Sequence, residues 1–223
     1  MLSAHREGHL RSGESKSRMT EAPNEEAIVP WVGRRDQIKV ATAIRSTWLN
    51  SSLRALKERD LLKRYLEILP KEHHEAVLGT IAGVWLPVEV GVAHYEAMND
   101  LGLPTAEIVQ IGKETSAWLH GSVFSIAINL AKGAGVSPVT VLGQLPRFWS
   151  RSMQGGGVAT FRTGPKDARL EFAGFPCARV GYCRVAVRGV IHGIMEKFAH
   201  AVYVRDMPLL CTSTTLGYRI SWV

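Results

Sequence analysis

Cysteine is scarce in this chain of 223 residues, with only Cys177, Cys183 and Cys211. An odd, small number of cysteines argues against a disulfide scaffold and predicts free thiols in a reducing compartment. Residues 1–18 are polar and lack the apolar centre of a secretory signal. No apolar run reaches the roughly 20 residues that a membrane-spanning helix needs. We therefore expect a cytoplasmic protein without a membrane span.

Several motifs with a known mechanism are absent. The sequence contains no Gly-x-Gly-x-x-Gly, no Walker loop and no Gly-x-Ser-x-Gly. The three glycines at 155–157 precede a strand pattern rather than a helix, so they predict a chain break and not a phosphate loop. His73 and His74 are adjacent and would point apart on a helix, which excludes the two-histidine zinc site of metalloproteases. No motif therefore points to a nucleotide-binding loop or a nucleophile elbow, and a catalytic triad depends on geometry that a sequence does not show.

Apolar residues make up 46% of the chain and charged residues 21%, as in an ordinary globular protein. The net charge of +7 is uneven, because residues 151–223 hold ten basic and four acidic side chains. A basic region can bind an anionic partner, nucleic acid included, or it can be a solvated surface rich in arginine. No run of five like charges occurs, so a basic tail is absent.

The first two thirds of the sequence has the apolar spacing of helices. Helical spacing begins at Asp36 and continues to Leu69, where Pro70 ends it. The apolar stretch 74–98 is expected to bend or split at Pro87. Further helices are expected from residue 105, over 113–132, and from 138 to 145 with Ser137 as its N-cap. We expect residues 1–30 to be a disordered leader, with Met19 as an alternative start.

After the three glycines the pattern changes to that of strands. Residues 158–163 and 169–173 predict a hairpin, and 180–200 predict one amphipathic helix. Residues 201–204 and 216–223 predict two more strands. The class is therefore α+β, with a single domain over 31–223. Its helical part spans 36–150 and its β-β-α-β-β part spans 157–223.

The sequence resembles a family of uncharacterised bacterial proteins, chiefly myxobacterial. That family is similar to the fold group of haem nitric-oxide-binding domains, vinyl-reductase-like sensory domains and Golgi transport-particle (TRAPP) subunits. The segments that carry the resemblance are 96–97, 101–103, 111–115, 145–149, Gly193, 201–204 and 218–222. The resemblance implies a helical layer packed on a four-stranded antiparallel sheet, with a small-molecule pocket between them in several relatives. It implies no single activity.

The chemistry of each relative can be checked against the residues present. Haem-binding relatives need an axial histidine and a Tyr-x-Ser-x-Arg string; His94 and His120 lie on expected helices, but the string is absent. Zinc-binding relatives use clustered cysteines, which here would need Glu171, His192 or His200 as a further ligand. Buried thiols that only fill space are the simpler interpretation of Cys177 and Cys183. No cofactor and no metal ion are predicted.

Two sets of side chains are candidates for binding. Large rings and histidines in the helical part, beside small residues, favour a ligand pocket, against the alternative of ordinary core packing. These residues are Trp85, His94, Tyr95, Trp118, His120, Phe124 and Trp149, and Tyr182 of the β-β-α-β-β part is a further candidate. A second set favours an anion or partner surface, against the alternative of a solvated surface. It comprises Arg147, Arg151, Arg179, Arg184 and Arg188.

The leading hypothesis is a non-catalytic module with a regulatory or sensory role, which binds a small apolar ligand or a protein partner. The alternative is an enzyme whose acid–base residues are assembled by the fold, with Glu89, His94, His120 and Tyr182 as candidates. A third hypothesis is nucleic-acid binding through the basic third of the chain. The segment 36–69 is a candidate homodimer interface, although its own domain can bury it equally well.

Overall fold

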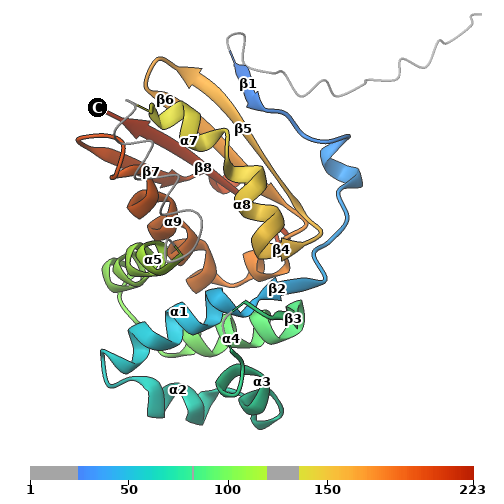
Figure 1. The fold of residues 1–223 in the computed structure, drawn as a ribbon, viewed down its shortest axis with the longest axis vertical. Helices are drawn as coiled ribbons and strands as arrows, with labels where there is room; N and C mark the ends of the chain where they lie inside the picture. Colours follow the sequence, from blue (N-terminus) through green and yellow to red (C-terminus); the bar gives the residue numbers. More distant parts are fainter. Residues whose placement is uncertain (1–24, 82, 120–135) are drawn as a thin grey trace, which may run out of the picture.

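The computed structural model describes residues 25–81, 83–119 and 136–223 (Figure 1). It is an α+β fold, as predicted, in which helices cover one face of an antiparallel sheet. The hairpin, the helix and the two further strands expected after the glycines are all present, in the order β-β-α-β-β. No helix in these ranges is both long enough and apolar enough to span a bilayer.

The main sheet has five strands rather than four, in the order β1-β5-β6-β8-β7. Its members are β1 (Glu26–Val29), β5 (Gly157–Gly164), β6 (Asp167–Ala173), β7 (Val202–Asp206) and β8 (Thr215–Trp222). Strand β1 lies in the segment that we expected to be a disordered leader. It pairs with β5, where Ala27 lies opposite Phe161. A strand of four residues gives too little alternation to be recognised in a polar sequence.

The expected helix from Asp36 begins later than predicted. A short 3-10 turn, η1 (Arg35–Gln37), is followed by extended chain and strand β2 (Ala43–Arg45), and helix α1 (Ser46–Lys57) starts only there. The extended segment hydrogen-bonds to other parts of the chain: Ala41 N–H donates to Gly174 O at 2.7 Å, and Gly156 N–H donates to Lys39 O at 2.7 Å. Tertiary hydrogen bonding therefore overrides the helical spacing.

The remaining helical part forms a lobe at one end of the sheet (Figure 1). Pro87 divides the apolar stretch as expected, because β3 (Trp85–Pro87) ends there and α4 (Val88–Asp100) begins. Strands β3, β2 and β4 (Met153–Gln154) form a small second sheet. The other elements of the lobe are α2 (Leu62–Ile68), η2 (Lys71–His73) and α3 (His74–Leu78).

Helix α5 (Thr105–Leu119) is one continuous helix where we predicted a break near residue 113. It packs against α9 (Gly181–Met195) with backbone close to backbone, since a Cβ on Gly112 would overlap the carbonyl oxygen of Ala186. Gly189 and Gly193 of α9 face α5 in the same way. Three glycines therefore permit a helix contact too close for side chains in this place.

The inner face of the main sheet is covered by α9 and by α8 (Leu145–Ser152), which follows α7 (Pro138–Leu142). Ser137 caps α7 as predicted, because its hydroxyl accepts from Thr140 N–H at 3.3 Å. The ring of Trp149 on α8 packs on Phe172 of β6, with ring centroids 5.3 Å apart. Two further 3-10 turns, η3 (Pro176–Arg179) and η4 (Pro208–Leu210), flank α9 and β8.

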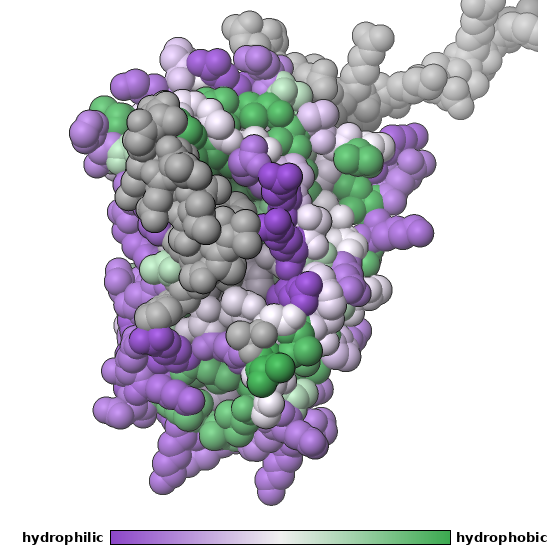
Figure 2. All heavy atoms as spheres, in the orientation of Figure 1, coloured by the Kyte–Doolittle hydropathy of each residue, from purple (hydrophilic) through white to green (hydrophobic). Residues whose placement is uncertain are grey.

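Hydrophobic surface gathers at the end of the molecule formed by α2, α3 and β3 (Figure 2). Leu78, Ile81 and Val84, in the chain from α3 to β3, are exposed by 47%, 77% and 39%. The expected dimer segment 36–69 contributes most of its apolar residues to the core of its own domain instead, with Leu49, Leu53 and Leu56 of α1 buried.

Candidate functional site

A narrow cavity lies inside the molecule where α1, α4, α5 and α9 meet. Its volume is about 280 Å³ when the solvent at its mouth is included, and the space that it encloses is that of about one water molecule. The wall is mostly apolar. It consists of Trp48, Ser52, Tyr95, Ile111, Gly112, Thr115, Tyr182, Ala186, Val187 and Val190. The glycine contact between α5 and α9 forms one side of this space.

Two residues of this wall carry a buried polar atom without a partner. The indole Nε1 of Trp48 and the hydroxyl of Tyr182 are inaccessible to solvent and make no hydrogen bond with the described residues. Both side chains are almost wholly buried, with residue exposures of 8% and 2%. A buried donor without a partner costs about 1–3 kcal/mol, so such atoms are uncommon in a native interior. Both atoms belong to residues that line the cavity.

A second polar cluster adjoins the cavity through Ser52 and is fully satisfied. His94 on α4 is wholly buried, with Nε2 2.6 Å from Ser52 Oγ and Nδ1 2.7 Å from the Tyr65 hydroxyl. One tautomer satisfies every group: Tyr65 O–H donates to Nδ1, Nε2–H donates to Ser52 Oγ, and Ser52 O–H donates to the Leu49 carbonyl at 3.0 Å. We call these three side chains the His94 cluster.

Burial sets the protonation state of the His94 cluster and of the tyrosines in the cavity wall. Burial lowers the pKa of His94 to about 3, so the ring is neutral at pH 7. Burial raises the pKa of Tyr65 and, in the cavity wall, that of Tyr95 and Tyr182. The described part of the cavity wall thus offers neutral hydroxyl and indole groups and no group that titrates near pH 7.

The predicted ligand-binding residues are divided by the structure. Tyr95 and Tyr182 line the cavity, and His94 lies one residue behind it in the His94 cluster. Trp85 is half-buried on β3, with the Arg45 guanidinium 4.0 Å from its ring centre. Trp149 is in the sheet core and donates from Nε1 to Gly155 O at 2.9 Å. The side chain of Trp118 and all of His120 and Phe124 lie outside the described residues.

Trp48 and Thr115 were not among the predicted site residues. Trp48 and Ser52 are four positions apart on α1, which places them on the same face of that helix. This spacing was the available signal for Trp48. The sequence holds no comparable signal for Thr115, because its place in the wall depends on how closely α5 approaches α9.

The five arginines of the predicted anion or partner surface differ in their contacts. Arg147 and Arg151 are exposed on α8. Arg179 pairs with Glu96 at 2.6 Å and Arg188 pairs with Asp206 at 2.9 Å. Arg184 donates to the carbonyl oxygens of Ala178 and Thr212. Three of the five side chains therefore bind within the domain.

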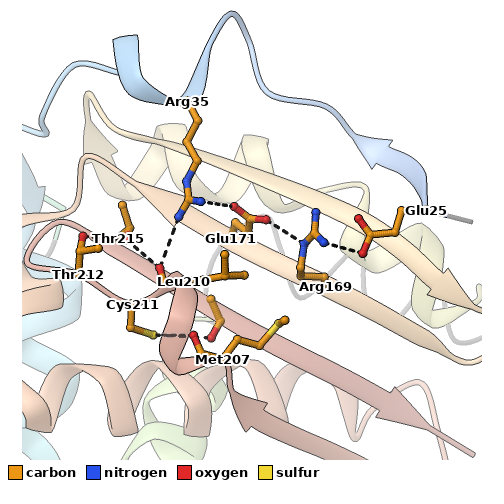
Figure 3. A network of polar contacts seen from close by, with 10 residues as sticks. Glu25, Arg35, Arg169, Glu171, Met207, Leu210, Cys211, Thr212 and Thr215 are labelled. Atoms are coloured by element: carbon orange, nitrogen blue, oxygen red, sulfur yellow. Dashed lines mark hydrogen bonds and ion pairs between the residues drawn. The ribbon is translucent and has the colours of Figure 1, made fainter. Parts of the chain in front are cut away.

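The outer face of the sheet carries a separate chain of ion pairs (Figure 3). The carboxylate of Glu171 on β6 is buried, 3.2 Å from Arg35 and 2.8 Å from Arg169. Arg169 also contacts Glu25 at 2.5 Å, and Arg35 donates to the carbonyl oxygen of Leu210. This network fastens the N-terminal segment across the sheet. Glu171 is therefore engaged by two arginines and does not serve as a metal ligand beside the core thiols.

Within the described ranges, no three His, Cys, Asp or Glu side chains are placed to share a metal ion. Of the enzyme candidates, Glu89 is exposed in the first turn of α4, His94 is buried with both ring nitrogens engaged, and His120 lies outside the described residues. A general base needs a free nitrogen or carboxylate within reach of a substrate. The described residues assemble no such group at the cavity.

No family model and no curated protein sequence matches this chain. Solved structures of H-NOX proteins do match it. A mutant of the Fe(II) unliganded H-NOX protein from K. algicida matches with a TM-score of 0.60 and 9% identity, over 81% of this chain and 97% of that one. A mutant of an H-NOX protein from S. oneidensis in the Fe(II) ligation state matches with a TM-score of 0.55 and 12% identity, over 81% and 96%. The chain therefore has the H-NOX fold.

The fold raises the question of haem, which the described residues do not fit. An axial ligand needs a free imidazole nitrogen, and both nitrogens of the buried His94 are hydrogen-bonded within the protein. The space that the cavity encloses is that of about one water molecule, far smaller than a porphyrin. The Tyr-x-Ser-x-Arg string is absent from the whole sequence. The described residues therefore do not form a haem pocket.

Proposed function

We propose that this protein is a non-catalytic module with a sensory or regulatory role, which binds a small, mainly apolar molecule in the cavity between α1, α4, α5 and α9. One observation carries the proposal: Trp48 Nε1 and the Tyr182 hydroxyl are buried, have no partner among the described residues, and are part of one apolar wall. A pocket with apolar sides and a few polar groups is the usual form of a small-molecule site.

The two unpartnered atoms define the chemistry of the ligand. Both can donate a hydrogen bond, and the high pKa of Tyr182 keeps its proton in place at neutral pH. The ligand therefore carries a hydrogen-bond acceptor such as a carbonyl oxygen, on a short apolar body. A charged ligand is disfavoured, because no charged side chain is part of the described wall.

The size of the cavity limits the affinity. A ligand contributes at most about 1.5 kcal/mol per heavy atom, so a two-atom ligand binds no more tightly than millimolar. A ligand of several heavy atoms can bind more tightly, and it needs the opening of the cavity as well as its narrow part. A short-chain carbonyl compound meets both conditions.

Two measurements test this function. Native mass spectrometry of the full chain, compared with its denatured mass, should show a retained small molecule. In parallel, the indole N–H signals in a proton–nitrogen NMR spectrum should be followed during titration with 2-butanone and 2-pentanone. The Trp48 signal should shift saturably. The Trp149 signal serves as the matched control, because Trp149 is equally buried but already donates to Gly155 O.

The variant Tyr182→Phe sharpens the test, because it removes one donor and preserves the shape of the wall. It should weaken ketone binding and abolish any retained mass. A bare native mass together with a Trp48 signal that no ketone moves more than the Trp149 signal would contradict the proposed function.

A further inference from the structure

A shallow groove lies on the outer face of the main sheet, next to Arg169 of the ion-pair network, because one of its residues, Arg219, is the strand partner of Arg169. It has a volume of about 660 Å³ and is open to solvent. Five side chains from β6, β7 and β8 line it: Asp167, Tyr203, Arg205, Arg219 and Ser221. None of them belongs to the interior cavity, so this groove is a second and independent feature of the fold.

Strand register places two arginines side by side in this groove. Arg205 of β7 lies directly opposite Arg219 of β8, and Arg219 lies directly opposite Arg169 of β6. Side chains directly opposite one another in an antiparallel pair have Cβ atoms about 5 Å apart, and like charges in these positions repel. The arrangement is therefore unfavourable unless an anion compensates for it.

Neighbouring carboxylates neutralise the three arginines to different degrees. Arg169 is neutralised by Glu25 and Glu171. Arg219 shares Asp167, whose Oδ1 is 3.3 Å from Arg219 Nε. Arg205 makes no ion pair or side-chain hydrogen bond with any described residue. The neighbouring carboxylate of Asp206 points away to Arg188 on α9, 2.9 Å away, and so does not serve Arg205.

We propose that this groove binds a nucleoside monophosphate. The forked guanidinium groups of Arg205 and Arg219 fit a phosphoryl group, which can accept from both and cancel their repulsion. Tyr203 lies two residues from Arg205 on the same face of β7, and 56% of its surface is exposed. Its ring offers a platform for stacking of a base.

The remaining lining residues fit the sugar. Ser221 donates to Asp167 Oδ1 at 2.5 Å, and Arg219 uses the same oxygen. The second carboxylate oxygen, Oδ2, is left to accept a hydrogen bond from a ribose hydroxyl. Asp167 of β6 and Tyr203 of β7 both lie opposite Ser221 of β8. The carboxylate and the tyrosine ring are therefore on either side of Ser221. Phosphate, base and sugar thus each meet a suitable group within one groove.

Calorimetric titration of the full chain with adenosine monophosphate and guanosine monophosphate tests the proposal. Adenosine, inorganic phosphate and an acidic peptide are the comparison ligands. A nucleotide should bind at least tenfold more tightly than any of them, because only a nucleotide engages both Tyr203 and the arginines. Rising salt should weaken binding.

Variants assign the binding to this groove. Arg205→Ala should weaken nucleotide binding about tenfold, the effect of losing one charge-assisted hydrogen bond. Arg205→Lys should recover part of that loss, and Tyr203→Ala should remove the preference for nucleotide over inorganic phosphate. Arg147→Ala, an exposed arginine on α8, is the control and should have no effect.

Three results would overturn the proposal: no nucleotide binding at millimolar concentration, equal binding of nucleotide and inorganic phosphate, or unchanged binding in Arg205→Ala. Binding of the acidic peptide alone would show that the groove recognises protein instead. Circular dichroism of each variant establishes that it is folded. None of these outcomes depends on the interior cavity.

Discussion

The His94 cluster and the cavity beside it are two buried polar regions with opposite properties. In the first, one tautomer of His94 gives every donor an acceptor. In the second, Trp48 Nε1 and the Tyr182 hydroxyl have none among the described residues. Ser52 belongs to both regions. Satisfied hydrogen bonds stabilise a fold, whereas buried donors without acceptors cost free energy, and the ligand that we propose would supply the missing acceptor.

Among the variants that test the difference between these two regions, His94→Ala should change the free energy of unfolding most. The change empties the volume of the ring and leaves the Tyr65 and Ser52 hydroxyls without their partner. The free energy of unfolding, measured by urea denaturation, should fall by about 3–5 kcal/mol. His74→Ala is the control: His74 makes one hydrogen bond, to Leu69 O, and its loss should cost clearly less. Equal losses in the two variants would contradict a special role for the His94 cluster.

A pH dependence of stability should follow from the same residue. Burial lowers the pKa of His94 to about 3, below the roughly 6.5 of an unfolded histidine. Between these two values the unfolded chain binds a proton that the folded chain does not, so acid favours unfolding. The His94 contribution should fall by about 1.4 kcal/mol per pH unit below pH 6.5.

Urea denaturation between pH 7 and pH 4.5 measures this slope. The variant His94→Gln removes the titrating ring, and its difference from the parent protein should shrink steadily as the pH falls. Carboxylates titrate in the same range in both proteins and cancel in the difference. A difference that is constant with pH would show that His94 is not buried in the neutral form.

Tyr65→Phe and Tyr182→Phe form a matched pair, because both tyrosines are buried and differ in whether the hydroxyl has a partner. Tyr65→Phe should lower the free energy of unfolding by about 1–3 kcal/mol, since it leaves His94 Nδ1 without a donor. Thermal and urea denaturation measure the loss. A neutral effect at Tyr65 would mean that the hydrogen bond to His94 contributes nothing.

Tyr182→Phe should have the smallest effect, between no change and a gain of about 1 kcal/mol. The variant keeps the ring and removes a hydroxyl that is buried without a partner among the described residues. The same denaturation experiments apply, on protein freed of any retained ligand. A loss comparable to that of Tyr65→Phe would show that the Tyr182 hydroxyl already has a partner, and would remove the distinction between the two regions.

Much of the fold could be predicted from the sequence. Apolar residues that repeat every two residues in a strand, or every 3.6 in a helix, mark the face that packs against the core. The hairpin of β5 and β6, the helix α9 and the Ser137 cap were predicted in this way. Strand β1 was missed because it is short and exists through its partner β5. The apolar spacing before α1 wrongly predicts a helix, because the chain there hydrogen-bonds to Gly156 and Gly174, which are distant in the sequence.

Only part of the candidate site could be predicted from the sequence, because the rest depends on contacts between distant segments. Tyr95 was named from the rings of the helical part, Tyr182 was named as a further candidate, and both line the cavity. Whether a buried group has a partner depends on packing between helices, which no local pattern contains. Thus Tyr65, Tyr182, Trp48 and Trp149 look alike in the sequence. Among the described residues, Tyr65 and Trp149 have hydrogen-bond partners and the other two do not.

We propose that the cavity beside Trp48 admits a small molecule, and dissolved dioxygen is a direct probe of that space. Dioxygen is small and paramagnetic, so it speeds the relaxation of nearby protons without needing to bind tightly. We predict that dioxygen at a few atmospheres will relax the Trp48 indole proton several times more strongly than the Trp149 indole proton, although both residues have the same 8% exposure. Equal relaxation of the two protons would show that the space beside Trp48 is closed, and would contradict the account.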